Sequence, residues 1–336
     1  MSCDPECLDL INKLTCKVGK MDKDIQTLWD NTFLPTDQAR KTLIFMSDQG
    51  EATDPDVLAA VAVVNLINSD STKDLIGVLF GGDNNYPDGE YATLGANWAG
   101  FDSYVTAKKA FPALGNHDYD NSGTPGQPQI DKFSYLDDYG SNRRYYHVPF
   151  NDADIDLFVL NSGVDSAGVL NEADGNTLGS AQYDWFVSAI ANSSNKFKIV
   201  MFHHPYITIE TAATALAFDF LTDMDWIFES LGVDLVLNGH AHTDFHIKRV
   251  ITPGADKYCH VVNCSGVRDP KRDVDPSPIY GSALGDNYLV WHYADSLGVA
   301  PTYGHILVIE KYSNSLLCSF RNVNTQFTDH SFIIEK

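Results

Sequence analysis

Five short polar segments of this 336-residue chain carry side chains that can bind metal ions or move protons. Each segment directly follows an apolar run of the kind that forms a buried strand. Side chains beyond the carboxyl ends of parallel strands meet at one edge of a sheet, so we expect the segments to converge. They are Ser47-Asp48-Gln49-Gly50, Gly82-Asp83, Gly115-Asn116-His117-Asp118, His203-His204-Pro205 and Gly239-His240-Ala241-His242.

The donor types in these segments indicate a metal centre. Each residue alone has an ordinary role available, because Asp48 could cap a helix, Asn116 could hold a turn, and a lone buried histidine is usually structural. Together they offer carboxylate, amide and imidazole donors without a cysteine, which suits Fe, Mn or Zn. They are too many for one ion, whereas two ions that share Asp83 as a bridge would use them all.

The elements that must position these residues follow an α/β pattern. From Lys41 onward, strand-like and helix-like segments alternate, and the spacing of the first three polar segments suits successive strand–helix–strand units. The end of the chain has the pattern of antiparallel strands. The predicted strands are Thr42–Met46, Leu75–Phe80, Lys109–Leu114, Ile155–Leu160, Lys198–Phe202, Asp234–Leu237, His305–Glu310, Leu316–Phe320 and Ser331–Ile334; the predicted helices are Asp54–Asn68, Ser180–Asn192, Thr211–Leu221 and Asp225–Leu231.

Residues 8–30 form a separate amphipathic segment, in which apolar residues alternate three and four apart. This heptad seam favours a parallel homo-oligomer, while a helix packed on its own domain fits the pattern equally well. We therefore predict an N-terminal helix and linker over residues 1–35 and one large domain over residues 41–336. If the heptad seam forms a homo-oligomer, the N-terminal helix is the oligomerisation element. The seam consists of Ile11, Leu14, Val18, Met21, Ile25 and Leu28.

The charge balance limits the expected partners. The chain has 45 acidic and 23 basic residues, a formal net charge of −22 and a pI of about 4.6. Such a surface repels nucleic acid and anionic membranes, so neither is an expected partner. No apolar stretch is long enough to span a bilayer. An anionic substrate can bind only where a local positive centre outweighs the overall field.

The termini and cysteines give weaker indications. Residues 1–10 lack the basic and apolar regions of a signal peptide, so we expect a cytoplasmic or virion-associated protein if the chain is complete, and a secreted one if a leader was removed. Six cysteines are too sparse for a disulfide framework, and we expect them to be reduced. Cys259 and Cys264 would face opposite sides of a common strand.

In order along the chain, the polar segments resemble the signature of the purple acid phosphatases, within the calcineurin-like metallophosphoesterases. The pieces DNYLVWHY and YGHILVIE are similar to the small, tartrate-resistant type. The resemblance covers residues 41–336 and implies a metallophosphoesterase catalytic domain. Its expected fold is a four-layer αββα sandwich of two mixed β-sheets flanked by helices. The signature D-x-G, GD-x-x-Y, GNHD, V-x-x-H and GH-x-H matches Asp48–Gly50, Gly82–Tyr86, Gly115–Asp118, Val200–His203 and Gly239–His242.

The resemblance also implies a ligand set. Related enzymes with D-x-H in the first segment use that histidine as a ligand, but this chain has Gly50 there, and Tyr86 would replace the missing donor. A phenolate is hard and anionic, so it favours Fe(III) and keeps the net charge of the centre unchanged. By resemblance, Asp48, Tyr86 and His242 would bind Fe(III), Asp83 would bridge, and Asn116, His203 and His240 would bind a divalent ion (Zn, Mn or Fe(II)).

The function implied is acid phosphatase activity, in which a metal-bound hydroxide attacks a phosphate monoester of a small molecule or phosphoprotein. His117 would position the phosphate or protonate the leaving group, and Asp118 would orient His117. Relatives carry a further substrate-contacting histidine that is missing here. His204 or His246 is a candidate to replace it, although a structural role is the favoured interpretation of each, and Tyr206 is a further candidate for a substrate contact. The alternatives are a phosphodiesterase or nucleotide hydrolase on the same site, and a metal-stabilised structural or virion module.

Overall fold

The computed structural model describes residues 39–336 apart from 121–122, 124, 141, 164–179, 206, 208, 210–227, 229, 251–257, 265–286 and 293–303. The predicted N-terminal helix and its linker lie outside the described residues. So do the helix predicted at Thr211–Leu221 and most of the one predicted at Asp225–Leu231. The division of the chain into an N-terminal unit and one large domain therefore stays a prediction.

The first sheet has six strands in the order β13-β12-β11-β1-β2-β3. The strands β1, β2 and β3 are parallel, and β11, β12 and β13 are antiparallel to their neighbours. The antiparallel end of the chain predicted from the sequence is thus confirmed. The strands are β1 (Arg40–Met46), β2 (Lys73–Phe80), β3 (Ala110–Pro112), β11 (His305–Lys311), β12 (Ser315–Asn322) and β13 (Thr328–Glu335).

The second sheet has seven strands in the order β10-β8-β9-β7-β6-β5-β4. The strands β5, β6, β7 and β9 are parallel to their neighbours in that series, while β4, β8 and β10 pair in antiparallel fashion. Both sheets are therefore mixed, as predicted. The strands are β4 (Tyr146–Phe150), β5 (Ile155–Val159), β6 (Phe197–Met201), β7 (Leu235–Asn238), β8 (Asp244–Val250), β9 (Tyr258–Cys264) and β10 (Asn287–His292).

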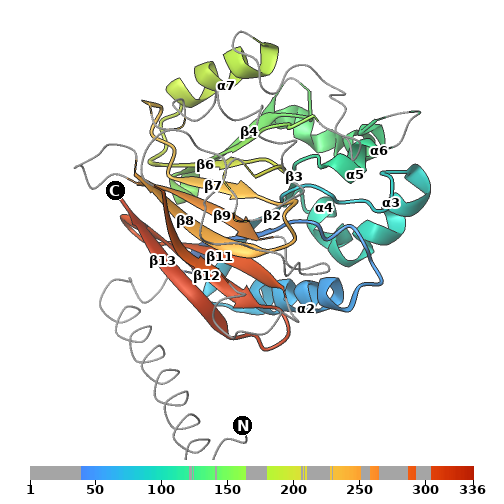
Figure 1. Cartoon of the computed structure of the whole chain (residues 1–336), viewed down its shortest axis with the longest axis horizontal. Coiled ribbons are helices and arrows are strands. Elements are labelled where there is room, and N and C mark those ends of the chain that lie inside the picture. The colour runs from blue at the N-terminus through green and yellow to red at the C-terminus, as the bar shows by residue number, and fades with distance from the viewer. Residues whose placement is uncertain are drawn as a thin grey trace, which may run out of the picture.

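Helices cover the outer faces of the two sheets and complete the predicted four layers. Figure 1 shows α2 (Pro55–Ser69) against the first sheet and α7 (Ala181–Ala191) against the second, with the sheets face to face between them. Asp54 caps α2 by accepting hydrogen bonds from the backbone N–H of Asp56 and Val57, and Ser180 caps α7 in the same way. Within the described residues, none of the helices has the length and apolar character needed to cross a membrane.

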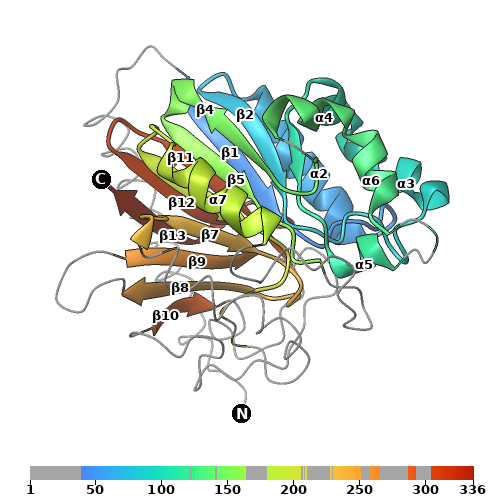
Figure 2. The same cartoon turned by 90° about the horizontal axis from the view of Figure 1, so that it is seen from above.

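Shorter helices follow β2 and β3 and gather at one side of the molecule, near the ends of those strands (Figure 2). One of them, α5, is a single turn that carries Asn116 and His117. These helices were not predicted from the sequence. They are α3 (Tyr91–Trp98), η1 (Ala99–Phe101), α4 (Asp102–Thr106), α5 (Asn116–Tyr119), α6 (Gln127–Lys132) and η2 (Ser134–Tyr139). A further short helix that was not predicted, η3 (Asn151–Ala153), lies between β4 and β5.

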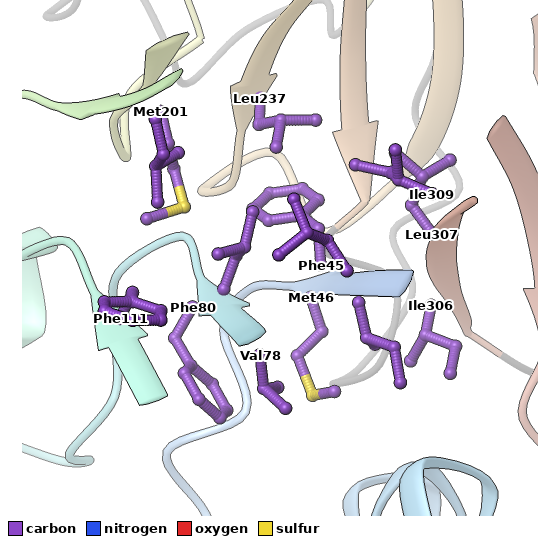
Figure 3. Close-up of a cluster of buried hydrophobic side chains, with 14 of the residues drawn as sticks. Phe45, Met46, Val78, Phe80, Phe111, Met201, Leu237, Ile306, Leu307 and Ile309 are labelled. Carbon is purple, nitrogen blue, oxygen red and sulfur yellow. The ribbon is translucent and has the colours of Figure 1, made fainter. Parts of the chain in front are cut away.

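The main core lies between the sheets and under α2. Alternate residues of β1 point to opposite faces, so Phe45 packs toward Leu237 of the second sheet while Met46 points toward α2, as Figure 3 shows. All three are fully buried. A second cluster, which includes Phe186 of α7 and Val236 of β7, fills the space under α7. The ends of β1 and β7, which carry candidate ligands, are thereby fixed against one another.

Cys259 and Cys264 lie on β9 and face opposite sides of the strand, as predicted. Cys264 belongs to the core between the sheets, and Cys259 belongs to the cluster under α7, so the two face opposite sides of the strand. Both are reduced, as is Cys318.

A buried ion cluster joins the two sheets near their antiparallel strands. His305 of β11 donates Nδ1–H to Asp244 Oδ2 of β8 at 2.7 Å and Nε2–H to Asp329 Oδ2 of β13 at 2.8 Å. Burial alone would lower the pKa of His305, but the hydrogen bonds and charges of the two carboxylates raise it to about 9. His305 is therefore an imidazolium at neutral pH.

This arrangement predicts a loss of stability on alkalinisation. The pKa of His305 lies above its unfolded value of about 6.5, so its contribution is complete below that pH and is lost as the pH rises through about 9. The free energy of unfolding, measured by urea titration, should fall by up to about 3 kcal/mol between these pH values. His305→Gln should abolish the fall. His147→Gln, which removes a partly exposed histidine paired with Asp156, should retain it; an unchanged alkaline decline in His305→Gln would contradict the assignment.

Candidate metal centre

The ends of the parallel strands bring the predicted segments together. Met46 at the end of β1 pairs with Phe80 at the end of β2, and Phe80 pairs with Pro112 of β3. In the second sheet, Met201 of β6 pairs with Leu237 of β7. All five segments therefore leave their strands at neighbouring ends, which confirms the convergence expected from the sequence.

Backbone hydrogen bonds join the segments across the two sheets. Ser47 N–H donates to the carbonyl of Cys264 at 3.1 Å, which connects the end of β1 to the end of β9. Asp48 N–H donates to Gly82 O at 3.0 Å, and Gly239 N–H donates to His203 O at 2.8 Å. The site is thus held by main-chain bonds that do not depend on a bound ligand.

Four candidate ligands adopt left-handed backbone conformations. Their φ angles are 61° for Asp48, 52° for Asp83, 69° for His240 and 47° for His242. A residue with a Cβ atom adopts this conformation at a cost of about 1–2 kcal/mol, and such strain concentrates at functional sites. The packed strands on either side hold the strained residues in place, which aims their side chains into a common space.

Gly50 explains how Tyr86 reaches the centre. A Cβ atom on Gly50 would overlap the backbone of Asn84 and Asn85, so no side chain fits at this position. Gly50 instead forms two main-chain hydrogen bonds with the second segment, from its N–H to Asp83 O at 3.1 Å and from Tyr86 N–H to its carbonyl at 2.9 Å. The position of Tyr86 therefore depends on the absence of a side chain at residue 50.

The first group of side chains comprises Asp48, Asp83, Tyr86 and His242. The phenolic oxygen of Tyr86 lies 3.0 Å from Asp83 Oδ2, 3.4 Å from Asp48 Oδ1 and 3.4 Å from His242 Nε2. His242 Nε2 also lies 3.3 Å from Asp48 Oδ1. Donor atoms of Asp48, Asp83 and His242 are close enough to one another to hold a single ion.

The second group comprises Asn116, His203 and His240, with His204 beside them. Asn116 Oδ1 lies 3.0 Å from His203 Nε2 and 2.9 Å from His240 Nδ1. Donor atoms of His203, His204 and His240 could hold a second ion. His203 Nε2 is 3.3 Å from Asp83 Oδ2, so Asp83 faces both groups, as a bridging ligand must.

The electrostatics of the first group fit a cation. Asp48 and Asp83 are both almost completely buried, and among the described residues their ion pairs are with histidines. Burial opposes ionisation of Asp83, but the positive charge of His203 outweighs it and lowers the pKa of the carboxyl well below its usual range. Among the residues that the structure describes, the buried Nδ1 atom of His242 has no hydrogen-bond partner. Within the same part of the chain, the two adjacent carboxylates pair with neither lysine nor arginine, and a metal ion would neutralise their charge.

His117 lies beside the first group and remains accessible. Its ring centroid is 4.5 Å from that of Tyr86, and its side chain is 31% exposed. The Nδ1 atom donates to the carbonyl oxygen of Pro87 at 2.7 Å, because a carbonyl can only accept, which leaves Nε2 available. Asp120 Oδ2 lies 3.4 Å from the same Nδ1. His117 is thus oriented by Pro87 and Asp120.

Asp118 joins the second and third segments. Its carboxylate accepts from Gly115 N–H at 2.9 Å and from Asn84 N–H at 3.1 Å. Its expected role in orienting His117 stays a prediction. Burial, with the negative charge of Asp83, raises the pKa of Asp118 to about 7. The single turn of α5 points the Asp118 side chain back at the N-terminus of that helix, which explains its bond to Gly115.

The predicted substrate contacts separate into three cases. His204 is buried next to His240, with a ring-centroid distance of 4.5 Å. His246 lies on β8, where its two ring nitrogens face His260 Nδ1 at 2.8 Å and His330 Nε2 at 3.0 Å, so the structure places it in another cluster. Tyr206 lies outside the described residues.

Two residues of this region had not been predicted. Ser162 Oγ lies 2.6 Å from His204 Nδ1, and Asn84 Nδ2 donates to Ala113 O at 2.7 Å and to Gln129 Oε1 at 2.8 Å. Ser162 follows the buried strand β5, so its position after an apolar run was a usable signal. The signal for Asn84 was its place directly after Asp83.

The comparisons with known proteins agree with this geometry. The family model described as calcineurin-like phosphoesterase matches residues 41–244, which is more than half of the chain and includes every candidate ligand. No protein in a search of curated sequences matches.

Several solved structures share the fold. A purple acid phosphatase, PPD1, from yellow lupin (Lupinus luteus) matches with a TM-score of 0.62 and 15% identity, covering 90% of this chain and 55% of that one. This chain thus spans little more than half the length of the lupin enzyme. GAP50, the anchor in the inner membrane complex of Plasmodium, matches with a TM-score of 0.58 and 12% identity over 89% of both chains.

A dimetal phosphatase from Danio rerio matches with a TM-score of 0.55 and 12% identity, covering 88% of this chain and 98% of that one. At these identities, the similarity concerns the fold. The family model and the two adjoining ligand groups lead to one conclusion: the chain belongs to the calcineurin-like phosphoesterase family.

Proposed function

We propose that this protein is a phosphatase of the purple acid type that hydrolyses phosphate monoesters with an iron(III) ion and a divalent ion. The observation that carries the proposal is the position of the Tyr86 oxygen, 3.0 Å from Asp83 and 3.4 Å from both Asp48 and His242. A buried phenol among two carboxylates is a hard, anionic donor set, which favours a trivalent ion. Tyr86 is 5% exposed, so its phenol lies within the group and not at the surface.

The ligands divide between the two ions by contact. Asp48, Tyr86 and His242 would hold Fe(III), Asn116, His203 and His240 would hold Zn²⁺, Mn²⁺ or Fe²⁺, and Asp83 faces both groups. Bound there, the two ions supply Lewis acidity that activates water and stabilises charge on the phosphoryl oxygens. His203 donates Nδ1–H to Gly81 O at 2.9 Å, which fixes its ring and leaves Nε2 as the donor atom.

The side chains around the ions would bind the ester and move its proton. His117 reaches the accessible side of the centre with Nε2 available, since Pro87 O occupies Nδ1. It can therefore hydrogen-bond a phosphoryl oxygen or give a proton to the departing alkoxide. Because the net charge is −22, a phosphorylated substrate binds where local positive charge outweighs the overall field, and the two proposed ions would supply that charge.

The main alternative keeps the centre and changes the ester. Cleavage of phosphate diesters or nucleotides would use the same ions, and p-nitrophenyl phosphate, its bis-ester and a nucleotide series separate these activities. A metal-stabilised module without activity is a second alternative, and Plasmodium GAP50 shares the fold as an anchor. Our proposal requires p-nitrophenyl phosphate to be the fastest of the nitrophenyl esters.

Tyr86→Phe should remove the colour of the protein. We expect the purified wild type to be violet and to contain about two metal ions per chain. Loss of the phenolic oxygen should abolish the visible absorption band and lower the iron content, as measured by absorption spectroscopy and elemental analysis. Tyr104→Phe is the matched control, because its hydroxyl bonds Asn65 away from the centre. A colourless wild type that is fully active with divalent ions alone would overturn the assignment of iron.

His117→Ala should separate metal binding from turnover. We expect the variant to keep its colour and metal content but to lose about 100-fold or more in kcat on alkyl phosphate monoesters, whose leaving groups need a proton. The loss on p-nitrophenyl phosphate should be smaller, since nitrophenolate leaves without protonation. Equal losses on both esters would instead assign His117 to phosphate binding, and no loss on either would exclude it from the site.

A further inference from the structure

The sequence pattern assigns His203 and His240 to the second group of ligands and leaves His204 outside it. We propose that His204 is a further ligand of the ion held by this group, positioned by Ser162, and that it makes the group select Zn²⁺ over Mn²⁺. This inference rests on the proposed two-ion centre and deepens it, because it identifies the divalent ion.

The chain bends where β6 ends, and the bend brings two consecutive histidines to the same space. In an extended strand, neighbouring side chains point to opposite faces. Here the rings of His203 and His204 lie 5.0 Å apart, nearly perpendicular at 83°, and both are close to His240, at 5.2 Å and 4.5 Å. His204 thus lies nearer to His240 than His203 does, and donor atoms of all three could reach one ion.

Ser162 fixes the ring of His204 in the way that Gly81 fixes the ring of His203. The hydroxyl of Ser162 lies 2.6 Å from His204 Nδ1, and Gly81 O lies 2.9 Å from His203 Nδ1. Both partners are buried, as are both rings. In each ring Nδ1 has a hydrogen-bond partner. Within the described residues, no hydrogen bond uses Nε2 of His204. Metal-binding histidines are oriented by such partners.

A third imidazole changes which divalent ion the second group binds more tightly. With Asn116 and Asp83 alone beside His203 and His240, the group offers two nitrogen and two oxygen donors, which Mn²⁺ tolerates well. Adding His204 makes nitrogen the majority donor. Imidazole-rich sites favour Zn²⁺ over Mn²⁺, in line with the general order of affinities of divalent ions.

A purely packing role for His204 has a different signature. If His204 only supported the ring of His240, its removal would disturb the position of His240 for any ion, and affinity for Zn²⁺ and Mn²⁺ would fall in proportion. A lost ligand instead lowers affinity for Zn²⁺ more than for Mn²⁺ and removes one nitrogen from the coordination shell. The ratio of the two affinities is therefore the informative quantity.

The test uses the full chain, stripped with a chelator and reloaded with Fe³⁺ and then Zn²⁺ or Mn²⁺ in equilibrium dialysis. We expect His204→Gln to lower the affinity for Zn²⁺ by more than about tenfold and the affinity for Mn²⁺ by clearly less. Ser162→Ala, a smaller change, should lower Zn²⁺ affinity by about tenfold. X-ray absorption at the zinc edge should count one imidazole fewer in His204→Gln. His147→Gln, far along the second sheet on β4, should match the wild type.

Two results would overturn the inference. One is an unchanged Zn²⁺-to-Mn²⁺ affinity ratio in His204→Gln, and the other is an unchanged count of imidazoles at zinc. If the wild type binds two ions and hydrolyses phosphate monoesters while either result is found, only the role of His204 fails. A wild type that binds fewer than two ions would contradict the proposed function itself.

Discussion

The burial of Asp48 and Asp83 side by side is the constraint on which the rest of the site depends. Each carboxylate is almost inaccessible to water, and their ion pairs within the described residues are with histidines. Such a pair repels itself unless positive charge is brought between its members. In a protein with a net charge of −22, that charge cannot come from the surrounding surface. The fold therefore concentrates imidazoles, one amide and a phenol around the two carboxylates, and these are the donors of the candidate metal centre.

Bringing these side chains together strains the backbone at several of the candidate ligands. Left-handed conformations at Asp48 and Asp83 are unfavourable for residues with a Cβ atom, and the hydrogen bonds between segments hold them in place. Gly50 also allows the close approach of two segments. Because it has no side chain, the second segment packs against it, and this contact places Tyr86 in the site. The identity of residue 50 and the position of Tyr86 are therefore coupled in this fold.

The sequence was most informative where one physical rule dominates. Apolar strands and the residues at their ends were predictable, because buried parallel strands are continuous apolar runs and their ends meet at one edge. The strands β4, β8, β9 and β10 were not predicted. In β8, for example, His246 and Lys248 interrupt the apolar residues, so the strand lacks a continuous apolar run. The same limit applies to the site: the role of Asp118 and the partnership of Ser162 with His204 depend on loop geometry that spacing does not encode.

The candidate ligands are spread from Asp48 near the start of the domain to His242, and they come from both sheets. During synthesis, the ribosome releases Asp48, Asp83 and Tyr86 long before the histidines of the second sheet exist. Neither group of donors is complete until β7 has emerged and has joined its sheet. On the proposed function, loading with metal would therefore be a late event in the synthesis of the chain, and the two carboxylates would stay hydrated until the imidazoles of the second sheet are in place.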